Sequence, residues 1–348
     1  MQNKAAGFVV LALSFSVTSG QLPGQPRQER AFQFAHTQTV LNAQEVAAVI
    51  KMIAGITQVG LSTETPPLTL TARGDAEQLA LAEWLFVELD QPVPAHAGTL
   101  MQEYRLPGVG ENVVRVYHAA NVATAQELNQ LATAVRGVSD LRLLTTHIAQ
   151  RAVIARGTAD RLGTAEWLLR EMDKARNEPI RHSATSQYLI QDPTDRGVLQ
   201  VLHMAHTESF QDLEVVATAM LTTAEVRWAF TYYPSKALAI RGKAGQVATA
   251  EWLFNELDQP MLSPVSAPQN KAAARIYRVP DSIDNELRVF NVTRAATGAD
   301  VNKAAEQVRM ATRSSWVFPY ESHRVIVFRG TTAQMAQAER VIEEMNKP

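Results

Sequence analysis

Residues that could do catalytic or metal chemistry are few and scattered in this sequence. It contains no cysteine, which excludes disulfides, thiolate metal sites and a cysteine nucleophile. It has no GxSxG, P-loop or HExxH motif. Glu343 and Glu344 are adjacent, but they fall at a predicted helix end, where solvated or capping carboxylates are common. We therefore expect no catalytic residue, no cofactor and no enzymatic activity.

Three histidines, His36, His118 and His203, align with one another after a predicted strand. A zinc site needs several ligands that converge on one ion, and these three lie in separate segments of the chain. His203 and His206 are close in sequence, but no third ligand is evident. We expect the aligned histidines to be polar residues at strand ends, and we expect no metal site.

The pattern that does stand out is a repeat. The dipeptide Arg-Gly recurs at spacings of 83, 85 and 88 residues, and an Ala-Glu pair follows each copy at a fixed distance. Such a shared register indicates one unit used four times. The residues that define it are Arg73, Gly74, Arg156, Gly157, Arg241, Gly242, Arg329 and Gly330.

Each copy has the pattern strand, helix, strand, strand, helix. In the second copy Leu128, Leu131, Ala132 and Val135 follow the i, i+3, i+4, i+7 spacing of one helix face. The later three copies align without gaps. In the first copy Val46 is matched with Leu128, and this copy is one residue shorter than the others. A short extended piece with a tyrosine precedes the later copies and is a candidate edge strand: Tyr104 to Leu106, Tyr188 to Ile190 and Tyr277 to Val279.

The fold class that this pattern predicts is α+β, as a tandem array of four β-α-β-β-α modules. Each module is expected to be a small sheet with two helices on one face. Linkers rich in Pro and Ala separate the modules. The predicted boundaries are 31–92, 101–175, 186–260 and 273–348.

The N-terminus is typical of a secretory signal peptide. Lys4 precedes an apolar run of 13 residues, and small residues follow it. The run is shorter than the ~20 residues that a transmembrane helix needs. We expect residues 1–20 to be a signal peptide, 21–30 a flexible leader, and the mature chain to have no membrane span. A buried helix is the alternative for the apolar run.

Ten residues after the glycine of each copy stand Trp84, Trp167, Trp252 and, in the last copy, Arg340. On a helical wheel Trp84 lies nearly opposite the apolar stripe of its helix. One possibility is that the linker or the tyrosine-containing strand of the same module covers these side chains. The other is that they contact the next module or another protein, where tryptophan is enriched. We treat Trp84, Trp167, Trp252 and Arg340 as candidate interaction residues.

The repeat resembles the periplasmic N-domains of bacterial secretins. The residues that carry the resemblance are Val153–Gly157, Ala165–Asp173 and their copies, which end in Asp90-Gln91-Pro92 and Asp258-Gln259-Pro260. The resemblance covers residues 31–348 and implies a KH-like fold that assembles in the cell envelope. The sequence ends directly after the fourth predicted helix, without a secretin barrel domain, so we do not extend the pore-forming function to it.

Two functions are compatible with these sequence features. The first is an exported, periplasmic scaffold without enzymatic activity, which binds other envelope proteins, with a secretin or the chain itself as candidate partners. The second is binding of single-stranded nucleic acid through the KH-like modules. It is disfavoured because no GXXG loop directly joins two predicted helices and the formal net charge is −2.

Overall fold

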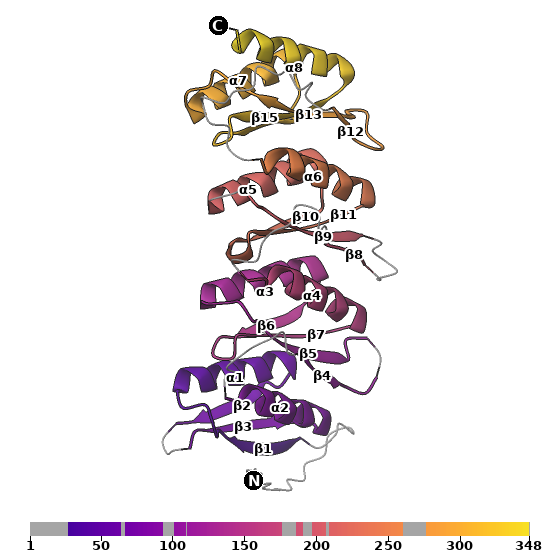
Figure 1. The fold of residues 1–348 in the computed structure, drawn as a ribbon. Coiled ribbons are helices and arrows are strands. Elements are labelled where there is room, and N and C mark those ends of the chain that lie inside the picture. Colours follow the sequence, from indigo (N-terminus) through magenta and orange to yellow (C-terminus); the bar gives the residue numbers. More distant parts are fainter. Residues whose placement is uncertain are drawn as a thin grey trace, which may run out of the picture. The chain divides into compact units, whose positions relative to one another are not determined.

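A computed structural model describes residues 27–63, 67–92, 101–108, 110–175, 186–190, 197–206, 209–259 and 276–347. The chain divides into two compact units, Met1–Asp173 and Lys174–Pro348. Each unit contains two modules of the predicted kind (Figure 1). The predicted signal peptide, residues 1–20, lies outside the described residues.

Module 1 has a three-stranded antiparallel sheet in the order β1-β3-β2. Its strands and helices follow the predicted order along the chain. They are β1 (Gln28–Gln33), α1 (Val40–Ile53), β2 (Gln58–Ser62), β3 (Thr69–Gly74) and α2 (Ala76–Leu89). Because β1 begins at Gln28, the expected leader of residues 21–30 is wrong at its end, and its last three residues belong to the sheet.

Modules 2, 3 and 4 have four-stranded sheets, in which the tyrosine-containing segment adds the predicted edge strand. The strand orders are β4-β5-β7-β6, β8-β9-β11-β10 and β12-β13-β15-β14, and every pairing is antiparallel. Module 2 consists of β4 (Met101–Arg105), β5 (Val113–His118), α3 (Ala125–Ser139), β6 (Leu143–His147), β7 (Ala152–Gly157) and α4 (Ala159–Met172).

The second unit repeats this plan twice. Module 3 consists of β8 (Ser186–Leu189), β9 (Val198–His203), α5 (Phe210–Ala219), a π-helical turn (Met220–Ala224), β10 (Trp228–Tyr232), a short 3-10 turn (Tyr233–Ser235), β11 (Ala237–Gly242) and α6 (Ala244–Leu257). Module 4 consists of β12 (Tyr277–Arg278), β13 (Glu286–Asn291), α7 (Gly298–Thr312), β14 (Val317–Tyr320), β15 (Val325–Gly330) and α8 (Thr332–Met345).

Helix starts are set by local side chains. Asp75 begins α2 and Thr331 begins α8, each in a capping box with the glutamine three residues later. Thr158 accepts the N–H of Arg161 at the start of α4. Each cap satisfies a backbone donor that the helix itself leaves without a partner.

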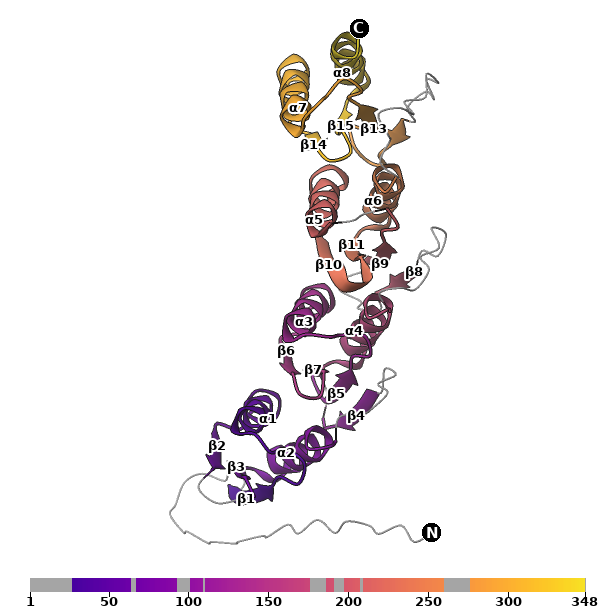
Figure 2. The same cartoon turned by 60° about the vertical axis from the view of Figure 1, so that its left-hand side comes forward.

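The two helices of each module pack on one face of its sheet, which confirms the predicted fold class (Figures 1 and 2). In module 2 this inner face includes Tyr117, whose hydroxyl donates to Leu162 O of α4. We call the opposite side of each sheet its outer face. Residues alternate between the two faces along a strand, so in β7 Ala152, Ile154 and Arg156 lie on the outer face.

The predicted match between module 1 and the other modules is wrong by three residues. The cap residue of α1 is Thr39 and that of α3 is Thr124, so Val46 corresponds to Leu131 rather than Leu128. A three-residue shift is close to one helical turn, and therefore it preserves the apolar face and leaves no trace in the helix pattern. In consequence His36 corresponds to Asn121 and His206, not to His118.

Candidate functional site

The outer face of the module 2 sheet is apolar and packs on the helices of module 1. Val114, Val116, Ala152 and Ile154 belong to the same buried cluster as the core of module 1. All four side chains are fully buried. Module 1 therefore docks through its helices, and module 2 docks through its outer sheet face.

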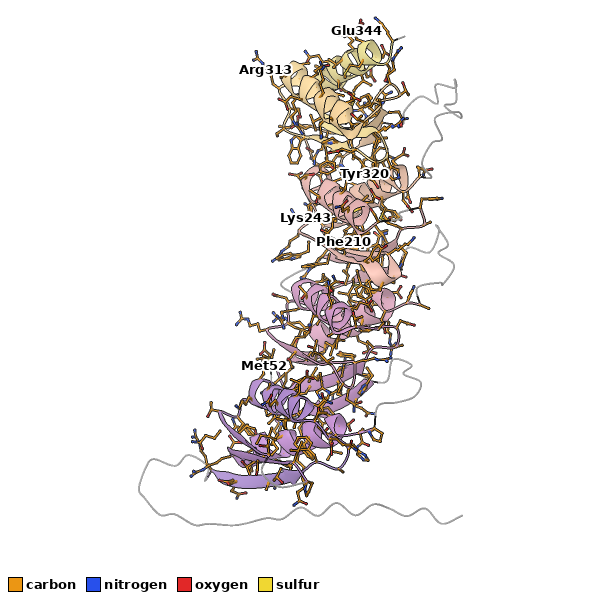
Figure 3. The ribbon with its side chains drawn as sticks, turned by 90° about the vertical axis from the view of Figure 1, so that its left-hand side faces the viewer. Met52, Phe210, Lys243, Arg313, Tyr320 and Glu344 are labelled. Carbon is orange, nitrogen blue, oxygen red and sulfur yellow. The ribbon has the colours of Figure 1, made fainter. Side chains whose placement is uncertain are left out.

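The second unit repeats this arrangement. Leu287, Val325 and Val327 lie on the outer face of the module 4 sheet and share one buried cluster with the helices of module 3. Tyr320, at the end of β14, belongs to the same cluster and is 1% exposed (Figure 3). The same sheet-on-helix contact therefore occurs in both units, between different sequences.

The arginine of the Arg-Gly motif joins the two modules in each unit. Arg156 donates Nη1 to Ile53 O, near the end of α1, at 3.1 Å. Arg329 donates Nη1 to Thr223 O, near the end of the module 3 helix, at 2.6 Å. Both acceptors lie two residues before a residue with positive φ, Gly55 or Glu225, that ends the helix. A helix leaves its last carbonyls without intrahelical partners, and a cation satisfies them well.

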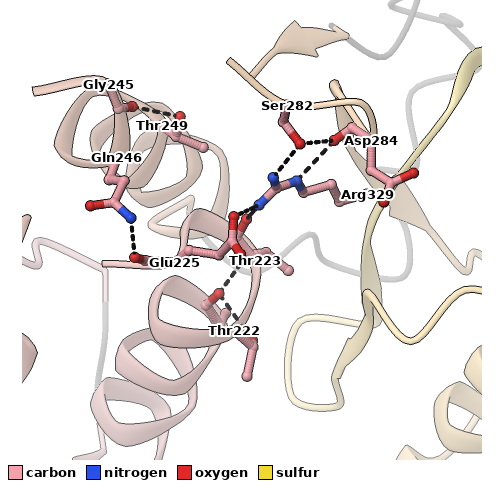
Figure 4. A network of polar contacts seen from close by, with 10 residues as sticks. Thr222, Thr223, Glu225, Gly245, Gln246, Thr249, Ser282, Asp284 and Arg329 are labelled. Atoms are coloured by element: carbon pink, nitrogen blue, oxygen red, sulfur yellow. Dashed lines mark hydrogen bonds and ion pairs between the residues drawn. The ribbon is translucent and has the colours of Figure 1, made fainter. Parts of the chain in front are cut away.

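Arg329 has the more complete set of partners (Figure 4). Its side chain is 3% exposed, and Nη1 also pairs with Glu225 Oε2 at 2.9 Å. Nε donates to Asp284 O and Nη2 to Ser282 Oγ, both in the loop before β13. The guanidinium also lies 4.9 Å from the ring centre of Trp316. Burial is tolerated here because the charge is paired and its donors are satisfied.

The other two motif arginines differ in exposure. Arg73, in module 1, has an exposed side chain, whereas Arg241, in module 3, is 5% exposed. The glycines of the motif allow close packing on the inner face. A Cβ on Gly157 would lie 2.5 Å from Leu141 Cδ2, and one on Gly74 would lie 2.8 Å from Gln78 Oε1. Any side chain at these two positions would force its neighbours to move.

Two of the candidate tryptophans contact the edge strand of the following module. The ring of Trp84 in α2 lies 5.4 Å from that of Tyr104 in β4, and Trp252 in α6 lies 5.2 Å from Tyr277 in β12. All three tryptophans, including Trp167, are partly buried, and Arg340 is exposed. In these two pairs the tyrosine of an edge strand therefore contacts the tryptophan of the preceding module, not the tryptophan of its own module.

We expect Trp84 and Tyr104 to be energetically coupled. Changing either residue to alanine removes the same ring contact, and aromatic pairs contribute about 0.5–1.5 kcal/mol beyond the area they bury. A double-mutant cycle on the free energy of urea unfolding should therefore show a coupling energy in that range. Additive effects of the two substitutions would show that the ring contact adds nothing to the docking of the two modules.

A buried aspartate after the second helix organises the loop after the first strand. Asp173 accepts the N–H groups of Ala120 and Asn121, and Asp258 accepts those of Ala205 and His206. Asp90 has the same role in module 1. Burial raises the pKa of Asp173 to about 6, although the two N–H groups lower it. The sequence shows this aspartate in the matching segments that end the second helix of each of these modules, but it gives no indication of its partner.

The histidines divide into two structural positions. Nδ1 of His118 lies 3.2 Å from Gln150 O, and Nδ1 of His203 lies 3.1 Å from Ser235 O. Both therefore end their first strand against the turn between the last two strands. His36 is instead in the loop that Asp90 holds, which corrects its predicted alignment. The described part of the chain contains no group of three His, Asp or Glu side chains placed to hold a metal ion.

The sequence pattern did not single out His147, at the end of β6. Its side chain is 1% exposed, and Nε2 lies 4.0 Å from Glu45 Oε2 of α1, across the contact between modules 1 and 2. Burial lowers the pKa of His147 to about 4. The sequence does not mark this position, because the residue type is not repeated among the modules. The corresponding residue of module 4 is Tyr320.

No helix among the described residues is both long and apolar enough to cross a membrane. No family model matches the chain, and a comparison with curated proteins finds no match.

Solved structures of secretins do match. The N-terminal domain of the secretin XcpQ from Pseudomonas aeruginosa is 13% identical, with a TM-score of 0.19, over 46% of this chain and 70% of that one. ExeD from Aeromonas hydrophila is 14% identical, with a TM-score of 0.16, over 72% of this chain and 42% of its own. The ETEC pilotin–secretin AspS–GspD complex is 11% identical, with a TM-score of 0.16, over 68% of this chain and 38% of that one. The chain is similar to these solved structures at identities of 14% or less.

Proposed function

We propose that this chain is an exported scaffold without enzymatic activity, which binds other proteins in the cell envelope and works with a secretin-type secretion or pilus machine. Its modules provide paired docking surfaces, an apolar sheet face and a helix face. The resemblance of its repeat to secretin N-domains supports the association with such a machine. Cofactors play no part in this function.

The observation that carries the proposal is the recurrence of one docking geometry. Arg156 and Arg329 make the same contact to a helix end in two units whose helices differ in sequence. Trp84 and Trp252 make the same contact to a tyrosine strand. The same contacts thus join similar modules whose sequences differ. Contacts of this kind are suited to association between proteins.

Composition supports protein partners over nucleic acid. The chain has 33 basic and 35 acidic residues, and many of the arginines on its sheets are paired with a carboxylate or a carbonyl. Binding to a phosphate backbone depends on clustered cations that release counterions. The outer faces of modules 2 and 4 are apolar instead.

Export makes a specific prediction about the mature N-terminus. If residues 1–20 are a signal peptide, the protein purified from its host should begin near Gly20 or Gln21. N-terminal sequencing or intact mass measurement checks this result. Soluble protein in the cytoplasm that still begins at Met1 would contradict export.

The binding role is tested by photocrosslinking in the host. A photoreactive amino acid is placed at the exposed residues Ile283 or Met310, and at the buried Leu85 as a control. We expect crosslinks to another envelope protein from the exposed sites and none from Leu85. Crosslinks to nucleic acid, together with salt-sensitive binding of single-stranded DNA in an anisotropy titration, would overturn the proposal in favour of the alternative.

A further inference from the structure

One edge of the module 1 sheet differs from the same edge in every other module. In modules 2, 3 and 4 the first long strand, β5, β9 or β13, lies between the central strand and an added edge strand. In module 1, among the described residues, β1 pairs with β3 alone. The hydrogen-bonding groups on the other edge of β1 are a template for a further strand.

The backbone of β1 shows which groups face that edge. Phe34 donates its N–H to Leu68 O on the β3 side, and the β1–β3 register has no bulge. Backbone groups alternate in direction along an antiparallel strand, so those of Glu29, Ala31 and Gln33 point to the open edge. In module 2 the corresponding groups face the edge strand, and Asn112 O accepts the N–H of Leu106 just beyond β4.

Charge on the inner face indicates what kind of strand fits. Arg115 of β5 pairs with Glu166 of α4 and also with Glu103 of the edge strand β4, at 2.7 Å. Its side chain is only 12% exposed. Arg30 is the corresponding residue of β1. It pairs with Glu83 of α2, and its side chain is 33% exposed.

The described residues thus provide no counterpart of Glu103 for Arg30. Two of the other three edges have a complementary pair at this position, Glu103 with Arg115 and Gln187 with Gln200, the latter at 3.3 Å. In module 4 the pair lies two residues away, between Arg278 and Glu286 at 3.1 Å. A carboxylate on an added strand, opposite Arg30, would complete the same arrangement.

The chain's own upstream sequence does not supply that carboxylate. At the spacing that separates Met101–Arg105 from β5, the residues before β1 would be 16–20, which contain no Asp or Glu. They also fall within the predicted signal peptide. A second copy of β1 is no better, because its one carboxylate, Glu29, lies on the outer face. Pairing about a two-fold axis perpendicular to the sheet would keep Glu29 away from Arg30.

We infer that the open edge of β1 binds an extended segment of another protein, which pairs antiparallel with β1 and places an Asp or Glu opposite Arg30. The segment adds a fourth strand, and module 1 then has the same sheet as the other modules. This inference rests on the proposed scaffold function and specifies one of its docking surfaces.

The test uses a fluorescent peptide with the sequence of residues 99–107, which contains the strand that fills this edge in module 2. Anisotropy measures its binding to the mature protein, and a matched peptide carries glutamine in place of Glu103. We expect the first peptide to bind and the glutamine peptide to bind about fivefold more weakly, since an exposed charge pair has a modest effect.

The protein variant Ala31→Pro removes one N–H from the open edge and none from the β1–β3 ladder. It should abolish binding, while Ala31→Ser should bind like the wild type, and the thermal melt of each variant shows whether it is folded. If Ala31→Pro does not fold, the two peptides decide the question.

Three results would overturn the inference. They are no binding of the first peptide, equal binding of the two peptides, and binding of the first peptide to a folded Ala31→Pro protein as tightly as to the wild type. The scaffold function is tested separately, by photocrosslinking from Ile283 and Met310. Those crosslinks do not depend on β1, so failure of the peptide test would leave the scaffold function standing.

Discussion

Replacing Arg329 with alanine is expected to lower the free energy of unfolding of the second unit by about 3 kcal/mol. The guanidinium is 3% exposed and bonds Thr223 O, Asp284 O and Ser282 Oγ. Its removal leaves these groups short of a donor and deletes the contact with Trp316. Glu225 also loses its partner, but it is 49% exposed, so water compensates for most of that loss. Urea unfolding followed by circular dichroism measures the change.

The chain offers a matched control for this substitution. Arg73 occupies the same position of the Arg-Gly motif, but its side chain is exposed. Arg73→Ala should therefore change the stability of its unit by no more than about 0.5 kcal/mol. Equal effects of the two substitutions would mean that the helix-end contact contributes nothing and that the arginine matters only for the local structure of its strand.

Acidification should destabilise the contact between modules 1 and 2 through His147. Its pKa is about 4 in the folded protein against an ordinary value near 6.5, so the unfolded chain takes up the proton first. The His147 contribution to stability is therefore complete above pH 6.5 and declines as the pH falls toward 4. The expected loss is about 2–3 kcal/mol. Burial is its main cause, the backbone hydrogen bond with Asn42 offsets part of it, and His118 adds to it.

The measurement is the stability of the wild type and of His147→Phe between pH 4 and pH 7. Asp173 shifts in the opposite direction, because its raised pKa makes the folded state take up a proton first as the pH falls below about 6. The contribution of His147 is therefore the difference between the two profiles, in which the effect of Asp173 cancels. His203→Gln, in the other unit, serves as a control. Parallel profiles for wild type and His147→Phe would contradict the prediction.

The sequence was sufficient to predict the modules, the helices on one face of each sheet and the added tyrosine strand. Repetition made this possible, since four copies of one pattern separate the shared fold from local variation. Module 1 was matched three residues out of register because its helix looks the same after a shift of nearly one turn. The cap residues Thr39 and Thr124 and the strand pairing, with Glu29 opposite Arg73, fix its register in the structure.

The contacts between modules were harder to predict. The Arg156 contact with Ile53 spans 103 residues, and nothing local identifies its acceptor. One signal was present, however. The strand Val113–His118 carries apolar residues on both faces, a pattern typical of strands buried on two sides. In module 1 the corresponding outer-face positions are polar or small, as in Glu29, Gln33 and Thr71, and Glu29 and Gln33 are exposed.

The docking of one module's sheet on the helices of the preceding module is tested most directly by the stability of module 2 alone and in its pair. Residues 101–175 are compared with residues 27–175 by urea unfolding, with hydrogen exchange reporting on module 2 in both proteins. Burial of Val114, Val116 and Ile154 under module 1 predicts that module 2 is more stable in the pair by at least about 3 kcal/mol. Equal protection of module 2 in the two proteins would contradict the claim that its outer sheet face is a docking surface.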